Sequence, residues 1–187
     1  MEEHHTNTEI TSANKYMNVL LALSDSKFGF AITDFVSKHR WPQNTKFHIL
    51  YVVEEQSIKR VLGFSPDIAQ EIIKQDEIYG SHLVKHAEAA IRKFLPAAEI
   101  ERCILSGSAK HEILNKAASI GADLIIVGAQ GRTGVTSLLL GSVSMAVLTH
   151  ATCSVLVVRI PANESGNLDM QLATDDLPAQ FISYARL

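Results

Sequence analysis

Glycine and serine residues between two apolar runs have the spacing of an anion-binding loop. Gly128 and Gly131 are followed by nine residues and then by Gly141-Ser142. Because glycine has no Cβ, it can adopt positive φ and let backbone N–H groups approach a ligand closely. A helix beginning at Ser142 would add unpaired N–H donors and a partial positive charge. The spacing therefore predicts a phosphate site with a nucleotide as its ligand.

The apolar runs on either side indicate where this loop lies in the fold. The run 124–127, Leu-Ile-Ile-Val, lacks polar alternation, as expected of a parallel strand covered on both faces. Residues 142–148 predict a helix that packs on the resulting sheet. A loop that leaves the carboxyl end of a strand and enters a helix is where open α/β sheets bind ligands. On its own, Gly-x-x-Gly is compatible with an ordinary turn, so the flanking elements carry the prediction.

Strands and helices alternate along the rest of the chain. We expect strands at 17–23, 46–53, 99–105, 124–127 and 153–159, and helices from Ser24 or Ser26, from Pro66, at 110–120 and at 142–148. Parallel strands need helical crossovers, and right-handed crossovers bury the sheet between two helical layers. These rules predict a three-layer α/β/α fold with a five-stranded parallel sheet. For this sheet we take the strand order 3-2-1-4-5. If the strands run in that order, Ser24 and Asp25 lie beside Gly128.

Helical periodicity also predicts which faces are buried. Trp41-Pro42 closes the first helix, because the residue before a proline is pushed out of the helical region. The inward face of that helix should hold Ala31, Ile32, Phe35 and Val36. In the helix that begins at Pro66, the apolar residues recurring at helical spacing are Ile72, Tyr79, Leu83, Ala87, Ala90 and Phe94.

Composition narrows the class of protein. Hydrophobic residues make up 47% of the chain without a run of about 18, so no membrane span is expected. The first residues, Met1-Glu2-Glu3-His4-His5, are polar and unlike a signal peptide. This start favours a cytoplasmic location. A net charge of −3 without a Lys/Arg cluster argues against nucleic-acid binding. Cys103 and Cys153 are expected to be small buried hydrophobes in a reducing compartment.

The glycine-loop pattern, with the preceding 121–128 run, resembles the ATP-binding branch of the universal stress protein family. The likeness covers about residues 16–160 and includes the segments 18–25, 49–52, Gly107-x-x-x-His111-x-Ile113 and 153–158. It implies an ATP-binding protein that acts as a nucleotide-dependent regulatory or protective module in stress response. Two alternatives stay open: a slow ATPase or phosphotransferase using the same site, and a nucleotide-free interaction protein of the same fold.

The resemblance also implies a set of nucleotide-binding residues. These are Leu23, Ser24, Asp25, Val52, Gly128, Gly131, Arg132, Gly141, Ser142, Val143 and Ser144. Asp25 is implied to lie near the ribose or near Mg²⁺ bound to the phosphates, and it could also cap the first helix. Val52 matches a position whose backbone meets adenine, with plain strand core as the other interpretation. Leu23 stands where many relatives carry proline.

The remaining loop residues each have a structural alternative. Arg132 is either a phosphate contact or a solvated loop charge. The hydroxyls of Ser142 and Ser144 either donate to phosphate oxygens or cap the helix. Among the histidines, His82 and His86 are interpreted as a solvated pair, and His111 as structural. No catalytic triad can be identified from spacing, so no residue is proposed as catalytic.

The chain divides into an N-terminal arm, 1–15, expected to be disordered, a domain, 16–160, and a C-terminal tail, 161–187. The tail is either a loose segment or a docking segment. The strand containing Val155-Leu156-Val157-Val158 is apolar throughout, yet as the fifth strand it lies at a sheet edge. Since exposed edges invite pairing, and the corresponding strands pair in relatives, we expect a homodimer through this strand unless the tail covers it.

Overall fold

The computed structural model describes residues 16–55, Ile58, 66–130 and 140–160. Strands and helices alternate in this part of the chain, as the sequence predicts. In order, they are β1 (Met17–Leu23), α1 (Ser26–Lys38), β2 (Thr45–Val53), α3 (Pro66–Phe94), β3 (Glu99–Ser106), α4 (Ala109–Ser119), β4 (Leu124–Gly128), α5 (Ser142–His150) and β5 (Ser154–Val158). The strand boundaries lie within one or two residues of those expected.

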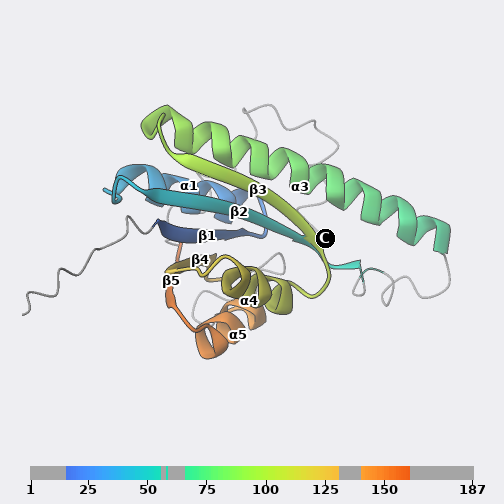
Figure 1. The fold of residues 1–187 in the computed structure, drawn as a ribbon. Helices are drawn as coiled ribbons and strands as arrows, with labels where there is room; N and C mark the ends of the chain where they lie inside the picture. The colour runs from blue at the N-terminus through green and yellow to red at the C-terminus, as the bar shows by residue number, and fades with distance from the viewer. Residues whose placement is uncertain (1–15, 56–57, 59–65, 131–139, 161–187) are drawn as a thin grey trace, which may run out of the picture.

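The strands form one parallel sheet in the order β3-β2-β1-β4-β5. Helices α1 and α3 cover one face of the sheet, and α4 and α5 cover the other (Figure 1). The predicted α/β/α fold and strand order are therefore confirmed. From β1 the chain proceeds outward to β3, and α4 then carries it back to β4 on the other side of β1. The topological switch point accordingly lies between β1 and β4.

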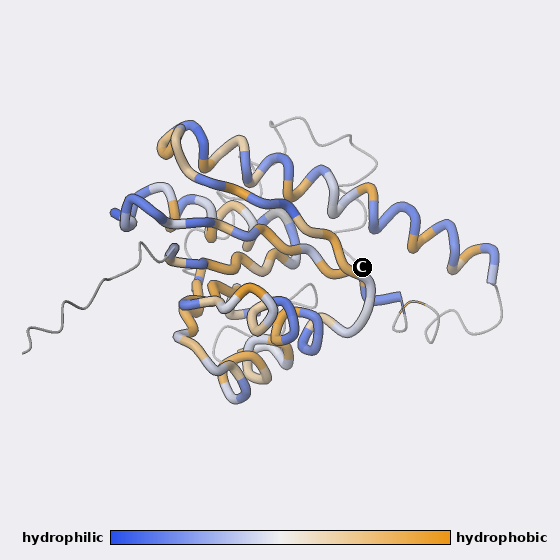
Figure 2. The backbone as a smooth tube through the Cα atoms, viewed as in Figure 1, coloured by the Kyte–Doolittle hydropathy of each residue, from blue (hydrophilic) through white to orange (hydrophobic). Residues whose placement is uncertain are grey.

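Alternating side chains of the central strands build two separate cores. On the α1/α3 face, Leu21 and Tyr51 pack with Ile32 and Ile91. On the opposite face, Leu20, Leu50, Ile113 and Val147 pack together. Figure 2 shows the corresponding colouring, with strongly hydrophobic central strands and alternating hydrophobic and hydrophilic turns along α3. Each fully buried side chain of this kind contributes about 1.5–3 kcal/mol, so the two cores stabilise the sheet whose edge carries the predicted site.

The structure decides two local expectations. Of the three residues that could cap α1, Ser24, Asp25 and Ser26, the cap is Asp25, because its carboxylate accepts the N–H of Phe28. In α3, Leu83 and Ala87 are buried as expected, but Phe94 is 67% exposed. Ile91 is the last buried residue of α3, so Phe94, one turn on at the helix end, lies beyond the packed stripe. Helix α1 ends at Lys38, ahead of Trp41-Pro42.

Tyr51 joins the sheet closely to α3. Its ring packs on Gly80, where an added Cβ would lie 2.2 Å from the ring. The Tyr51 hydroxyl donates a 2.7 Å hydrogen bond to Asp76 Oδ1, and the Tyr79 ring meets Tyr51 edge-on. Gly80 is therefore required by packing, since a methyl group at this position would displace a fully buried aromatic ring.

Several expectations concern residues outside the described ones: the arm 1–15, the tail 161–187, Gly131 and Arg132. Within the described part, no helix combines the length and apolar character that a membrane span requires.

Candidate functional site

The carboxyl ends of β1 and β4 meet at the switch point. Ala22 pairs with Val127, so the next residues, Leu23 and Gly128, lie at the same edge. Phe28, in the first turn of α1, packs against Gly128, where an added Cβ would lie 2.5 Å from its ring. The fold thus brings Ser24-Asp25 and the start of the glycine loop together, as the strand order predicts.

Asp25 is held in one orientation by its neighbours. Its Oδ1 accepts a 2.8 Å hydrogen bond from Phe28 N–H, and its Oδ2 accepts a 3.1 Å bond from Ser24 Oγ. Its carbonyl oxygen accepts the first bond of the helix, from Gly29 N–H at 2.8 Å. The half-buried carboxylate is therefore fixed at the positive end of α1, beside the end of β4.

Two hydrogen bonds anchor the start of α5 to the end of β4. Gly141 N–H donates to Ala129 O at 2.8 Å, and the buried Ser144 hydroxyl donates to Gly128 O at 2.5 Å. Ala129 N–H in turn donates to Val158 O of β5 at 2.8 Å. The two ends of the glycine-loop segment are consequently fixed to each other and to the sheet.

This anchoring decides which groups at the start of α5 would face a ligand bound at this edge. The first intrahelical bond is donated by Met145 N–H to Gly141 O, so the N–H groups of Ser142, Val143 and Ser144 precede it. The side chain of Ser142 is exposed, whereas the hydroxyl proton of Ser144 is donated to Gly128. The helix therefore offers backbone donors and one serine hydroxyl, which suit an anion.

The expected positive φ is absent from the anchored glycine. Gly141 has φ −62°, which any residue can adopt. Among the described glycines, positive φ occurs at Gly107 and Gly121. Gly128 is required by packing inside the protein, because the Phe28 ring occupies the space that a Cβ at this position would fill. Tertiary packing, and not backbone conformation, thus selects glycine at the start of this loop.

Leu23 and Val52 lie at the ends of β1 and β2 with their side chains in the cores. They are 5% and 8% exposed, on opposite faces of the sheet. Val53 O accepts from Gly107 N–H on the β3 side. Because successive peptide groups of a strand point to opposite neighbours, the peptide groups of Val52 point towards β1, which ends at Leu23. A ligand here would meet main chain, not the side chains.

Glu54 and Glu55, which follow β2, were not identified from the sequence. Glu54 Oε1 accepts the N–H of Ala109 at the start of α4 at 3.2 Å, and Glu55 accepts the hydroxyl of Ser106. The positive end of α4 is therefore satisfied by a carboxylate of the protein itself. The sequence shows that Glu54 directly follows an apolar strand, but it does not show that Glu54 contacts Ala109, which is far away in the chain.

The other polar candidates do not form a reactive centre. His82, His86 and His111 are exposed, and the described residues contain no group of three His, Cys, Asp or Glu side chains placed to hold a metal ion. Both thiols are half-buried instead of fully buried, and burial raises the pKa of Cys103 and of Cys153. The thiolate form is thus disfavoured at both positions.

Comparison with known proteins identifies relatives of this chain. Residues 15–159 match the family described as the universal stress protein family. Universal stress protein A homolog 2 of Coxiella burnetii (strain RSA 493 / Nine Mile phase I) is 59% identical over 148 residues, covering 79% of this chain and 97% of the relative. Universal stress protein YxiE of Bacillus subtilis (strain 168) is 30% identical over 150 residues, covering 77% of this chain and 99% of the relative.

Solved structures share the fold. The hypothetical protein MJ0577 has a TM-score of 0.63 at 23% identity, over 79% of this chain and 98% of that one. A universal stress protein family protein from Arabidopsis thaliana, with AMP bound, has a TM-score of 0.58 at 18% identity, over 80% and 95%. The universal stress protein from Archaeoglobus fulgidus in complex with dAMP has a TM-score of 0.50 at 18% identity, over 76% and 98%.

Proposed function

Since the chain belongs to the universal stress protein family, we propose that it is an ATP-binding member that acts as a nucleotide-dependent regulatory or protective module in stress response. Structural relatives are described with AMP and with dAMP bound, which supports an adenine nucleotide as the ligand class. The signal is occupancy of the site: the nucleotide-bound surface is the form that a protein partner reads.

The observation that carries this proposal is the anchored start of α5 at the switch point. Bonds from Gly141 and Ser144 hold the first turn of α5 at the end of β4, next to the end of β1, after which Asp25 lies. We assign the phosphates to the N–H groups of Ser142 and Val143, together with the Ser142 hydroxyl. Adenine meets the main chain at Leu23 and Val52. Gly131 and Arg132 complete the proposed site from outside the described residues.

Asp25 suits a magnesium ion carried in with the triphosphate. Mg²⁺ prefers oxygen ligands and is usually held by one or two carboxylates plus phosphate oxygens. An ionised carboxylate has about four acceptor sites, so a helix-capping aspartate can also contact a metal ion. Asp25 would hold the ion, which would neutralise phosphate charge there, while the backbone of α5 orients the phosphates.

Two variants of Ser142 test the phosphate assignment. Proline is favoured at the first position of a helix and removes one N–H, and Gly141 has the extended conformation that a following proline requires. Ser142→Pro should therefore keep the fold and lose both the N–H and the hydroxyl. Ser142→Ala is the matched control, because it loses the hydroxyl alone, so the difference between the two variants reports the N–H. Relative to Ser142→Ala, Ser142→Pro should weaken ATP binding by about 10- to 100-fold, which corresponds to one charge-assisted hydrogen bond of about 1.5–3 kcal/mol.

The first measurement is thermal unfolding with ATP and Mg²⁺. At about 100 times the dissociation constant, a ligand stabilises the native state by about 2.7 kcal/mol, which a melting curve detects readily. No rise in Tm at millimolar ATP would overturn the proposal in favour of a nucleotide-free interaction protein. Wild-type affinity in a folded Ser142→Pro variant would overturn the phosphate assignment. Linear phosphate release that depends on Asp25 would favour the ATPase alternative.

A further inference from the structure

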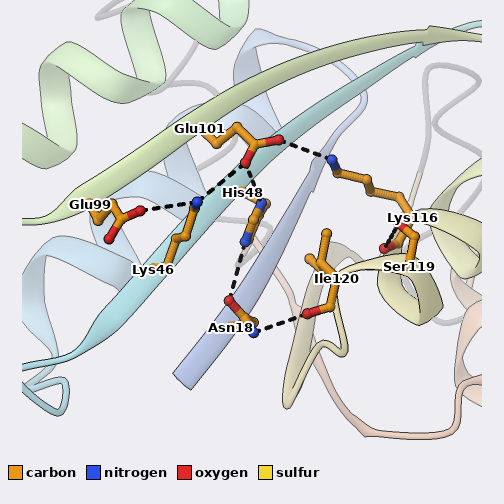
Figure 3. Close-up of polar contacts among 8 residues, drawn as sticks. All are labelled: Asn18, Lys46, His48, Glu99, Glu101, Lys116, Ser119 and Ile120. Carbon is orange, nitrogen blue, oxygen red and sulfur yellow. Dashed lines mark hydrogen bonds and ion pairs between the residues drawn. The ribbon is translucent and has the colours of Figure 1, made fainter. Parts of the chain in front are cut away.

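A buried histidine lies at the opposite end of the sheet from the proposed nucleotide site. His48, near the start of β2, is 3% exposed and lies on the sheet face that α4 covers, in step with Leu50 and Val52. Its Nε2 lies 3.4 Å from Asn18 Oδ1 on β1, and its Nδ1 lies 3.4 Å from Glu101 Oε2 on β3 (Figure 3). His48 is not identifiable from the sequence, because a lone histidine in an apolar strand gives no signal.

Both atoms that face the imidazole are acceptors. Asn18 donates through Nδ2 to Ile120 O at 3.0 Å, which fixes its Oδ1 towards His48. Glu101 presents a carboxylate oxygen on the other side. A neutral imidazole has one N–H and can satisfy one of these acceptors, whereas the imidazolium has two and can satisfy both. In agreement, Nδ1 has no hydrogen-bond partner within the described part of the chain.

The charged groups around His48 balance when it is neutral. Four charged side chains surround His48. Glu99 and Glu101 come from β3, Lys116 comes from α4, and Lys46 comes from β2 itself. Lys116 Nζ lies 3.1 Å from Glu101 Oε1, and Lys46 Nζ lies 3.0 Å from Glu99 and 3.5 Å from Glu101. Two cations thus pair with two carboxylates. A proton on His48 gives three cations for the same two carboxylates, at a position that water does not reach.

We propose that His48 is a proton-binding site through which mild acid loosens α4 from the sheet. On protonation, Nδ1–H donates to Glu101 Oε2. The carboxylate of Glu101 is then shared between His48 and Lys116, and the two cations repel each other. The bond between Lys116 on α4 and Glu101 on β3 weakens as a result. This site is separate from the proposed nucleotide site, because it lies at the amino ends of the strands and the proposed nucleotide site lies at their carboxyl ends.

The direction of the pH effect follows from the environment of His48. Burial lowers the pKa of His48 below its ordinary value of 6.5, against the opposing effect of Glu101. The unfolded chain therefore takes up a proton at a higher pH than the native protein does. The stability that neutral His48 contributes is fully present above pH 6.5. It is lost as the pH falls from 6.5 towards the pKa of His48 in the native protein. For one proton, the unfolding constant rises by up to about tenfold per pH unit in this window.

Histidine-labelled NMR titration of the full chain, with His48 assigned from the His48→Gln variant, measures the proton directly. We expect the pKa of His48 to lie below 6.5, the ordinary value for histidine. Glu101→Gln should lower the pKa of His48 further, because it removes the facing carboxylate. Lys116→Met should raise it, because it removes a neighbouring cation. Opposite shifts of the His48 pKa in these two variants are expected only if Glu101 and Lys116 both face His48. Shifts in the same direction, or no shift, would overturn the proposal.

Hydrogen exchange tests the effect on α4. Between pH 7.5 and mild acid, after correction for intrinsic rates, protection of α4 amides should fall by about tenfold relative to that of α1. His48→Gln should abolish this difference, whereas His111→Gln, which removes an exposed histidine of α4 itself, should leave it unchanged. If His48→Gln does not fold, His48 is assigned as the one histidine whose titration changes in both Glu101→Gln and Lys116→Met, and the direction of the two changes decides the question. Equal loss of protection in α1 and α4 would also overturn the proposal.

Discussion

At the residue scale, Gly128 links the start of the glycine loop to the first helix through its contact with Phe28. Because an added Cβ would lie 2.5 Å from the Phe28 ring, we predict that Gly128→Ala lowers the free energy of unfolding by about 1–3 kcal/mol. The measurement is urea denaturation. The double variant Phe28→Ala/Gly128→Ala should be less destabilised than the sum of the two single variants, since the clash partner is gone. Strict additivity would show that Phe28 does not restrict this position.

Asp76 gives a second prediction at the same scale. Burial, and then the nearby Glu54 and Glu77, raise the pKa of Asp76 from 3.8 to about 7. Between these values the native protein keeps a proton that the unfolded chain releases, so stability present at low pH is lost as the pH rises through the window. Asp76→Asn cannot ionise, and its amide oxygen can still accept from Tyr51. We expect this variant to match the wild type near pH 4 and to be more stable above pH 7.

Chemical denaturation at several pH values measures this difference. Glu71→Gln is the control, because it neutralises an exposed carboxylate of the same helix. A constant difference between Asp76→Asn and the wild type at all pH values would contradict the prediction.

At the scale of elements, Asp25 has a capping role that can be separated from its proposed role in metal binding. Asp25→Ala should lower the free energy of unfolding by about 0.5–2 kcal/mol through loss of the α1 cap, whereas Asp25→Asn should keep the cap. If Asp25 also holds Mg²⁺, Asp25→Asn should weaken ATP binding in Mg²⁺ and leave binding in EDTA unchanged. Calorimetric titration under both conditions measures this, with Asp34→Asn on the same helix as the control. If Asp25→Asn and the wild type bind ATP with equal affinity in Mg²⁺, Asp25 acts only as the helix cap.

At the scale of the whole molecule, β5 is an edge of the sheet, and we propose that it pairs with a second copy. Val155, Leu156, Val157 and Val158 are half-buried within one chain, although an apolar strand of this kind is usually covered. Val157→Lys should therefore give a monomer by light scattering. Ile104→Lys places the same charge on the other edge strand, β3, and should leave the dimer intact.

Two results would change this interpretation. Wild-type protein that is monomeric at micromolar concentrations would contradict pairing through β5. If a chain truncated after Ile160 then dimerises, the tail covers the edge in the full chain. A circular dichroism spectrum of each variant separates loss of pairing from loss of the fold.

The sequence by itself determined the elements and their order. The apolar run 124–127 and the helical spacing in 66–94 depend on residues close together in the chain, so local periodicity predicts them. The need for right-handed crossovers then restricts the strand order, which the structure has as predicted. The glycine spacing likewise identified where the loop leaves the sheet.

The tertiary structure decided which atoms of these residues are available for function. Ser144 turns its hydroxyl to Gly128 O, and His48 lies between Asn18 and Glu101, which come from other strands. Such contacts depend on strand register and on how each helix packs across the sheet, and residues far apart in sequence set both. Local pattern therefore predicts where a side chain stands along its element, whereas its partners, its burial and its pKa arise only when the layers assemble.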